Sequence, residues 1–179
     1  MKSFKRPHTT LSVIVRIILW IILLVGGAVL GAVHDWNSPL FRSPLFHLIT
    51  FVLGVNVIRF SFRAAANGGR ELSRGRVGDI PRLETNRLVT TGIYSCMRHP
   101  MLFGLTLLPP GWALLIGSPT FIFIVAPAEM VFIILMVLVF EEMEAEKKFG
   151  EDYRRYREHV PMVSFRAVCL KKLFARKPS

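Results

Sequence analysis

Four long apolar runs constrain this chain more than any other feature of its sequence. They cover about residues 11–33, 45–62, 101–116 and 120–140, and polar segments separate them. About 20 apolar residues in a helix are enough to cross the hydrocarbon core of a bilayer. The mean hydropathy of +0.45 agrees with this interpretation. No strand pattern of consequence is present, so the sequence predicts an all-α integral membrane protein with about four transmembrane helices.

Glycine and proline predict how these helices pack. Gly27 and Gly31 form a GxxxG pattern, which permits close helix packing. Pro-Pro-Gly at residues 109–111 interrupts the third run, and proline inside a helix removes a hydrogen bond, so we expect a kinked or half-broken helix. The third and fourth runs are joined by a tight turn at residues 117–119. We therefore expect them to be antiparallel neighbours.

The basic residues predict the orientation. The net charge is +11, and Lys and Arg gather before the first run, in the segment 63–100 and in the tail. The positive-inside rule places these parts in the cytosol, with both termini. We expect a single membrane domain over residues 1–179, with a cytosolic loop at 63–100 and a cytosolic C-terminal part at 141–179. A bacterial inner membrane and the endoplasmic reticulum both fit. Because the positive-inside rule explains the charge more simply than nucleic-acid binding, no nucleic-acid partner is expected.

The C-terminal part is sharply polar. Between residues 141 and 160 charged side chains occur on all sides, but Phe149, Tyr153 and Tyr156 recur at helical spacing. This pattern predicts a C-terminal amphipathic helix that lies on the membrane surface or caps the bundle. The basic tail over residues 171–177 fits contact with anionic membrane lipids.

The two cysteines, Cys96 and Cys169, are expected to be free thiols. They lie far apart and belong to no CxxC motif, so they indicate neither a disulfide framework nor a metal site. We expect both on the cytosolic side, in a structural rather than a catalytic role. The sequence predicts no metal site.

Two polar features are expected to meet at the cytosolic face. Arg98 and His99 precede the third helix, in the segment LVTTGIYSCMRHPMLFG at residues 88–104, and Glu141 and Glu142 end the fourth. If these helices are antiparallel neighbours, a guanidinium and an imidazole face a pair of carboxylates. A simple pairing of oppositely charged helix ends would satisfy this arrangement without any ligand.

A ligand for this site would carry both charges. Its carboxylate would suit Arg98, and its ammonium or hydroxyl groups would suit the glutamates, while Tyr94, Tyr153 and Tyr156 would cover a flat ring. An amino-acid nucleoside such as S-adenosylmethionine meets these requirements. A phospholipid headgroup fits nearly as well, so residue chemistry alone leaves both open.

The order of these motifs resembles that of the isoprenylcysteine carboxyl methyltransferase and phospholipid N-methyltransferase superfamily. That family shows a Gly-x-Tyr turn, Arg-His-Pro, a helical hairpin, a Glu-Glu pair and Phe-Gly-x-x-Tyr-x-x-Tyr. The resemblance covers roughly residues 86–162. The matching residues are Gly92, Tyr94, Arg98, His99, Pro100, Gly104, Glu141, Glu142, Phe149, Gly150, Tyr153 and Tyr156.

The resemblance implies a membrane methyltransferase that uses S-adenosylmethionine. Its acceptor would be a lipophilic small molecule or a prenylated group, methylated at a carboxylate or an amine at the cytosolic face. Arg98 and Glu142 become catalytic candidates: Arg98 would orient a carboxylate of acceptor or donor, and His99 or Glu142 would take a proton from an amine. The cofactor-binding candidates are Tyr94, Arg98, His99, Pro100, Met101, Gly104, Glu141, Glu142, Tyr153 and Tyr156.

Two further residues are substrate candidates. Leu102 stands where the family usually has tyrosine, which predicts a changed substrate or cofactor contact. Glu129 is expected near mid-membrane, where an acid is costly and often functional; a packing role and a substrate contact both remain open. Neither the acceptor nor the oligomeric state follows from the sequence.

Two other classes of protein share the four expected spans. A small transporter would carry more polar residues along its helices and show symmetry between its halves, and neither is seen. A non-enzymatic membrane scaffold would not need Arg-His-Pro opposite Glu-Glu.

Overall fold

The computed structural model describes residues 8–78 and 85–175, and side chains from residue 18 onward. The basic residues before the first run, the side chain of Arg16, and Arg176 and Lys177 lie outside the described residues. All regular secondary structure in the described part is helical, and no strand occurs there, which confirms the predicted fold class. Three of its helices are long and apolar enough to cross a membrane, and a shorter apolar stretch covers Pro100–Ile116.

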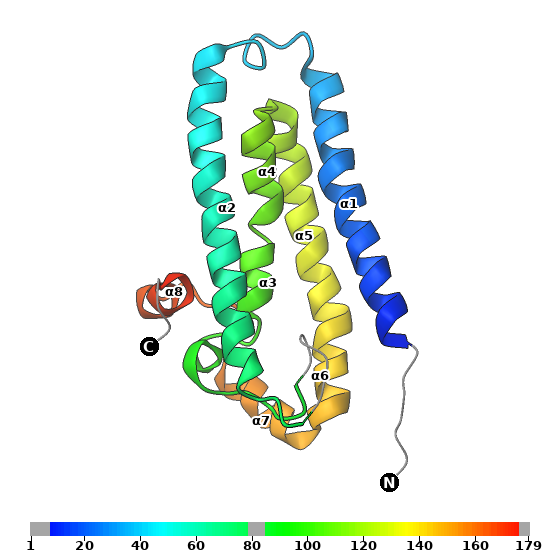
Figure 1. Cartoon of the computed structure of the whole chain (residues 1–179), viewed down its shortest axis with the longest axis vertical. Coiled ribbons are helices and arrows are strands. Elements are labelled where there is room, and N and C mark those ends of the chain that lie inside the picture. The colour runs from blue at the N-terminus through cyan, green and yellow to red at the C-terminus, as the bar shows by residue number, and fades with distance from the viewer. Residues whose placement is uncertain (1–7, 79–84, 176–179) are drawn as a thin grey trace.

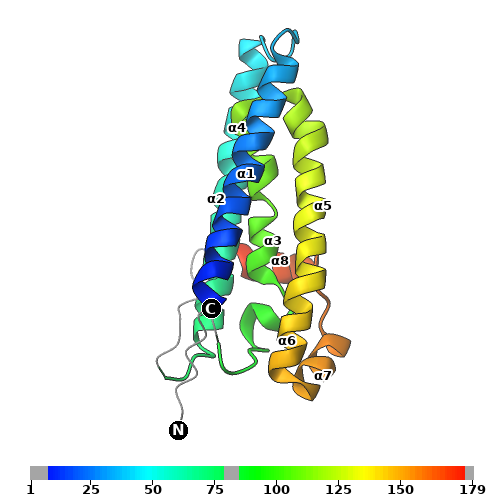
Figure 2. The same ribbon diagram turned by 90° about the vertical axis from the view of Figure 1, so that its right-hand side faces the viewer.

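The helices form an elongated bundle around a short central pair. Helix α1 (His8–Asp35) and helix α2 (Pro44–Ser73) are joined by a loop at one end of the bundle. Helices α3 (Pro100–Leu105) and α4 (Leu108–Ile116) run between them, and α5 (Ala126–Met136) lies on the side away from α1 and α2 (Figures 1 and 2). The short central helices therefore have neighbours on several sides.

The predicted break in the third apolar run is confirmed. The α-helix stops at Leu105 and a new one begins at Leu108, with prolines in its first turn. Proline is tolerated there because the first amides of a helix have no partner within it. Gly117, with φ +71°, then ends α4 and reverses the chain, so α4 and α5 are antiparallel neighbours as expected.

Helix α2 is longer than the sequence predicts. Residues 63–73 were expected in a flexible loop, and this expectation is wrong because the helix continues to Ser73. Small side chains on this stretch let α3 approach closely: a Cβ atom on Gly68 would lie 2.7 Å from Met101 Cγ. Packing against α3 thus outweighs the helix cost of glycine, which is about 1 kcal/mol per residue.

Helix α1 is fixed to the start of the last membrane helix by close contact and by a carboxylate. The buried Asp35 accepts hydrogen bonds from the Thr120 backbone amide at 2.8 Å and from the hydroxyls of Thr120 and Ser118. Gly27 and Gly31 face this same region without room for a Cβ atom. The close packing predicted from the GxxxG pattern is confirmed.

The last membrane helix runs without interruption from Phe121 to Phe149. It comprises η2 (Phe121–Val125), α5, η3 (Val137–Glu141) and α6 (Glu142–Phe149), in which η2 and η3 are π-helical turns. Gly150, with φ +57°, then turns the chain into α7 (Glu151–His159), which lies across the end of the bundle (Figure 1). The prediction of one amphipathic helix over residues 141–160 is therefore wrong: two helices meet at Gly150.

The prediction of two free thiols is also wrong. Cys96 follows the short helix η1 (Gly92–Ser95), and Cys169 lies on α8 (Ala167–Phe174); the two form a disulfide with Cα atoms 5.6 Å apart. Helix α8 folds back against α2 and η1, which brings together two residues 73 positions apart. Residue spacing alone carries no sign of this contact.

We expect Gly27→Val to destabilise the bundle and Gly26→Val to leave it intact. A Cβ atom on Gly27 would lie 2.6 Å from the Phe121 ring, whereas none of the described atoms lies within 4 Å of a Cβ on Gly26. Overpacking of this kind costs about 1–3 kcal/mol. Thermal unfolding of the two variants in the same detergent measures the difference. Equal midpoints would show that α1 does not pack through Gly27.

Candidate functional site

The Arg98–His99 segment is held between the membrane bundle and the C-terminal part. Pro100 begins α3 directly after it. On the other side, the backbone amide of Arg98 donates to Pro161 O at 3.0 Å, and that of His99 donates to Met162 O at 3.3 Å. The position of both side chains is thereby fixed by two distant parts of the chain.

Glu142 is the centre of a buried polar cluster. Its Oε1 atom accepts a hydrogen bond from Arg98 Nε at 3.0 Å and lies 2.6 Å from His99 Nε2. All three side chains are only 10% exposed. Glu141 lies on the other side of the imidazole, with Oε2 3.8 Å from His99 Nδ1. The predicted meeting of Arg-His with Glu-Glu is confirmed, and the groups touch directly.

Arg98 also caps helix α7. Its Nη1 atom donates to Arg157 O at 3.2 Å and to Val160 O at 2.7 Å, at the C-terminal end of that helix. The last carbonyls of a helix have no partner within it, and a cation there is favourable. One side chain therefore joins the end of α7 to the start of α3 and to Glu142.

The three tyrosines predicted to bind cofactor are all buried. The Tyr156 hydroxyl donates to Tyr94 O at 2.6 Å, and Tyr94 itself packs in a core cluster. The Tyr153 hydroxyl is buried beside the Glu142 carboxylate and makes no hydrogen bond of good geometry with the described residues. Burial, and then the neighbouring Glu142 carboxylate, raises the pKa of Tyr153 above its ordinary value. The hydroxyl is therefore protonated at neutral pH and able to donate to a ligand.

The remaining cofactor candidates lie on α3. Pro100 and Gly104 are buried, and Met101 packs against Gly68. Gly104 lies against α2, with its carbonyl accepting from Ser61 Oγ at 2.7 Å. Pro100 and Met101 directly follow His99 of the polar cluster in the sequence. Gly104 lies farther along α3 and contributes to the contact between α3 and α2.

An apolar groove runs from the polar cluster into the membrane region. Helices α1 and α5 are close at one end of the bundle and diverge toward the site (Figures 1 and 2). From Ile133 to Glu141 the groove is roughly 12 Å long, at 1.5 Å per helical residue. Its lining residues are Leu19, Trp20, Leu23, Leu102, Phe132, Ile133, Met136, Val137, Phe140 and Glu141. The structure thus places Leu102 and Glu141 in the lining of the same groove.

Glu129 lies apart from this cluster. It is buried, with Oε2 lacking a hydrogen-bond partner in the described part of the chain, and it faces Gly27. Thirteen residues separate it from Glu142, which is roughly 20 Å along the helix. It lies one helical turn beyond Ile133, where the groove ends.

Glu71 positions the Gly-x-Tyr turn, and no sequence pattern indicated this role. This buried carboxylate accepts from Thr91 Oγ1 at 3.2 Å and pairs with Arg74 at 2.9 Å. It packs against Gly92, which adopts φ +57° and has no room for a Cβ atom. Glu71 lies in the stretch that was expected to be loop, so nothing marked it as buried.

The fold and the site define an integral membrane helical bundle with a buried polar cluster beside a membrane-facing groove. A family model described as phospholipid methyltransferase matches residues 45–152, more than half of the chain, and the protein belongs to this family. The match runs from the start of α2 into α7 and includes the whole polar cluster. No curated protein matches the chain. No solved structure matches it either.

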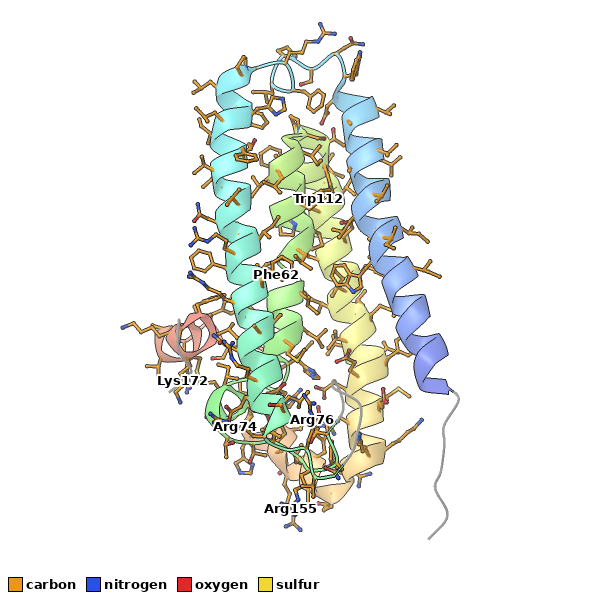
Figure 3. The ribbon with its side chains drawn as sticks, viewed as in Figure 1. Phe62, Arg74, Arg76, Trp112, Arg155 and Lys172 are labelled. Atoms are coloured by element: carbon orange, nitrogen blue, oxygen red, sulfur yellow. A yellow bond between two sulfur atoms is a disulfide. The ribbon has the colours of Figure 1, made fainter. Side chains whose placement is uncertain are left out.

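We expect Arg98→Ala to release α7 from the bundle. The substitution removes hydrogen bonds from a charged donor to two carbonyls and to Glu142. Each such bond contributes roughly 1.5–3 kcal/mol. Hydrogen exchange should therefore accelerate about tenfold or more over residues 151–162. Arg155→Ala is the control, since Arg155 is exposed on α7 (Figure 3). Unchanged exchange in Arg98→Ala would contradict the capping role.

Proposed function

We propose that this protein transfers a methyl group from S-adenosylmethionine to a lipid acceptor at the end of the bundle where α3 begins. The observation that supports this most directly is the position of Glu141. Its carboxylate faces His99 in the polar cluster, and the same residue lines the apolar groove. A polar donor and an apolar acceptor would meet there.

The residues of the polar cluster fit the proposed donor. Glu141 and Glu142 suit an ammonium group or ribose hydroxyls, and the unpaired Tyr153 hydroxyl can donate to a further oxygen or nitrogen. His99, Pro100 and Met101 lie at the same place in the chain and would complete the binding site. When bound, S-adenosylmethionine supplies a methyl group on a positively charged sulfur.

For Arg98 we propose a role different from the one that the sequence predicts. The sequence predicts that it orients a carboxylate of donor or acceptor. Its Nε and Nη1 atoms already bind Glu142 and two carbonyls of the chain. We therefore propose that Arg98 positions Glu142 and the end of α7.

We propose that His99 or Glu142 accepts the proton when the acceptor is an amine. An amine acceptor must lose a proton before or during methylation, whereas a carboxylate acceptor needs no base. The contact of 2.6 Å between His99 Nε2 and Glu142 Oε1 lets the imidazole share a proton with the carboxylate. With Glu141 at its other nitrogen, His99 connects the groove to Glu142.

The groove supports an acceptor with a hydrocarbon chain. Its length of roughly 12 Å is close to one leaflet of the hydrocarbon core, about half of 30 Å. Leucine at position 102, in place of the tyrosine usual in the resembling family, keeps the groove apolar beside Glu141. A chain inserted between α1 and α5 would also exclude water from the reacting groups. A phospholipid amine is our first candidate, and a prenylated carboxylate is the alternative.

We further propose that both termini face the cytosol. Charge and disulfide give opposite indications here, since disulfides are rare in a reducing cytosol and Cys96–Cys169 lies on the site's face. The proposed orientation rests on the distribution of charge, because three separate basic segments agree on it. Digestion of the C-terminal tail by protease in inside-out vesicles, but not in right-side-out vesicles, tests the orientation. Digestion only in right-side-out vesicles would reverse it.

We expect Tyr153→Phe to fold normally and to bind the donor less well. The lost hydroxyl lies beside Glu142 but makes no hydrogen bond of good geometry, so its removal costs little stability. S-adenosylmethionine and S-adenosylhomocysteine should raise the unfolding temperature of the wild type more than that of the variant. If neither compound stabilises the wild type, a transporter or a scaffold becomes the better interpretation.

We expect Leu23→Trp to impair methyl transfer without affecting donor binding. Leu23 lines the groove, whereas the neighbouring Ile22 is 61% exposed and lies outside it, so Ile22→Trp is the matched control. Transfer from radiolabelled donor is measured with phosphatidylethanolamine and with a prenylcysteine analogue. The acid or base lability of the product distinguishes an ester from a methylated amine. Equal transfer by both variants would exclude this groove as the acceptor site.

A further inference from the structure

Helix α8 has two apolar faces, and the bundle covers only one of them. Cys169 and Leu173 are buried in the core cluster with Met97. Val168, in contrast, is 65% exposed. The adjoining Phe165 is 76% exposed, and its ring meets Phe103 of α3 edge-on, with ring centroids 5.7 Å apart. The helix lies across the long axis of the bundle, beside α2 and at the level of α3 (Figures 1 and 2). This is the orientation of a helix that lies in the plane of a membrane surface.

Side chains of α2 and a disulfide to Cys96 fix α8 at this level. Asn67 Nδ2 donates to Leu173 O at 2.6 Å and to Ala175 O at 3.1 Å, at the end of the helix. The rings of Phe60 and Phe174 lie 5.3 Å apart. The Cys96–Cys169 disulfide adds a covalent link. Helix α8 is thus a fixed part of the fold.

The level of α8 coincides with the end of the apolar surface of α2. Exposed apolar side chains on α2 extend from Leu45 to Phe62, about 26 Å at 1.5 Å per residue. This is close to the thickness of the hydrocarbon core, about 30 Å. Helix α8 contacts α2 at Phe60 and Asn67, where that surface ends. Helix α8 therefore lies at the level of the boundary between the hydrocarbon core and the headgroups.

The charge of α8 is complementary to an anionic leaflet. Lys171 and Lys172 are exposed in its last turn, and Arg166 precedes its first residue; Lys172 lies at the margin of the bundle (Figure 3). No acidic residue occurs between 160 and 179. Basic residues beside an apolar helix face are typical of segments that bind anionic lipids.

We propose that α8 docks on anionic phospholipid, with Phe165 and Val168 among the upper acyl chains and Lys171 and Lys172 against the phosphates. Met97, which packs with α8, directly precedes Arg98 in the polar cluster. The docked helix therefore sets the level of the Arg98–Glu142 cluster relative to the headgroups. This proposal depends on membrane insertion and not on the proposed reaction.

Photocrosslinking in lipid nanodiscs tests the docking directly. A benzoylphenylalanine at position 168 should form lipid adducts, detected by mass spectrometry of the intact protein. The same residue in place of Arg155, exposed on α7, is the control and should form few. A second crosslinker at position 165 guards against a local folding defect at 168. Adducts at neither position of α8, or as many at position 155, would overturn the docking.

A charge variant tests the preference for anionic lipid. In nanodiscs with equal phosphatidylglycerol and phosphatidylcholine, the crosslinker at 168 should favour phosphatidylglycerol. Lys171→Gln with Lys172→Gln should lower this preference, by roughly fivefold for each lysine. Lys147→Gln with Lys148→Gln is the matched control, because this exposed pair lies on α6. An unchanged preference in the α8 variant would overturn the anionic partner. No methyl donor is present, so failure of the proposed reaction would not affect either result.

Discussion

The carboxylate of Glu142 is the point on which the rest of the site depends. It binds a guanidinium and an imidazole from the start of α3, and the same guanidinium holds the end of α7. Buried ion pairs add little net stability, because desolvation of the charges offsets their attraction. Removing one partner is strongly destabilising, however, since it leaves an uncompensated buried charge. The cluster therefore fixes the geometry of the end of the bundle where α3 begins more than it strengthens the fold.

Small residues allow the helices to pack closely enough to bring the guanidinium, the imidazole and the carboxylates together. Gly68 and Gly104 let α3 lie against α2, and Gly27 lets α1 meet the last membrane helix at the opposite end. Lipid is as apolar as leucine, so close packing rather than hydrophobic burial holds such helices together. Helix α1 packs tightly at that far end and diverges from α5 toward the site, where the groove opens (Figure 2).

The sequence predicted those features that depend on local composition or on neighbouring helices. The apolar runs predicted the membrane helices, and the proline pair predicted the break before α4. The short turn at Gly117 predicted that His99 lies opposite Glu142. Three features were not predicted from the sequence, because each depends on contacts between distant segments. The continuation of α2 needs α3 as a partner, the burial of Glu71 needs the Gly92 turn, and the pairing of Cys96 needs α8. The bend at Gly150 was not predicted for another reason. A single sequence does not distinguish a glycine that ends a helix from a glycine within one.

The position of the cluster relative to the bilayer explains why the groove and the polar groups share a residue. The last exposed apolar residue before the glutamate pair is Phe140, and Glu141 follows it at once. A lipid whose chain lies in the groove would present its headgroup at this boundary, where a charged donor from the aqueous side can also reach. Moving the glutamates one turn deeper would place charges in hydrocarbon, at a cost of roughly 3 kcal/mol each. One turn further out, they would lie beyond the reach of a chain in the groove. The boundary is therefore the one depth at which both substrates of the proposed reaction can be bound together.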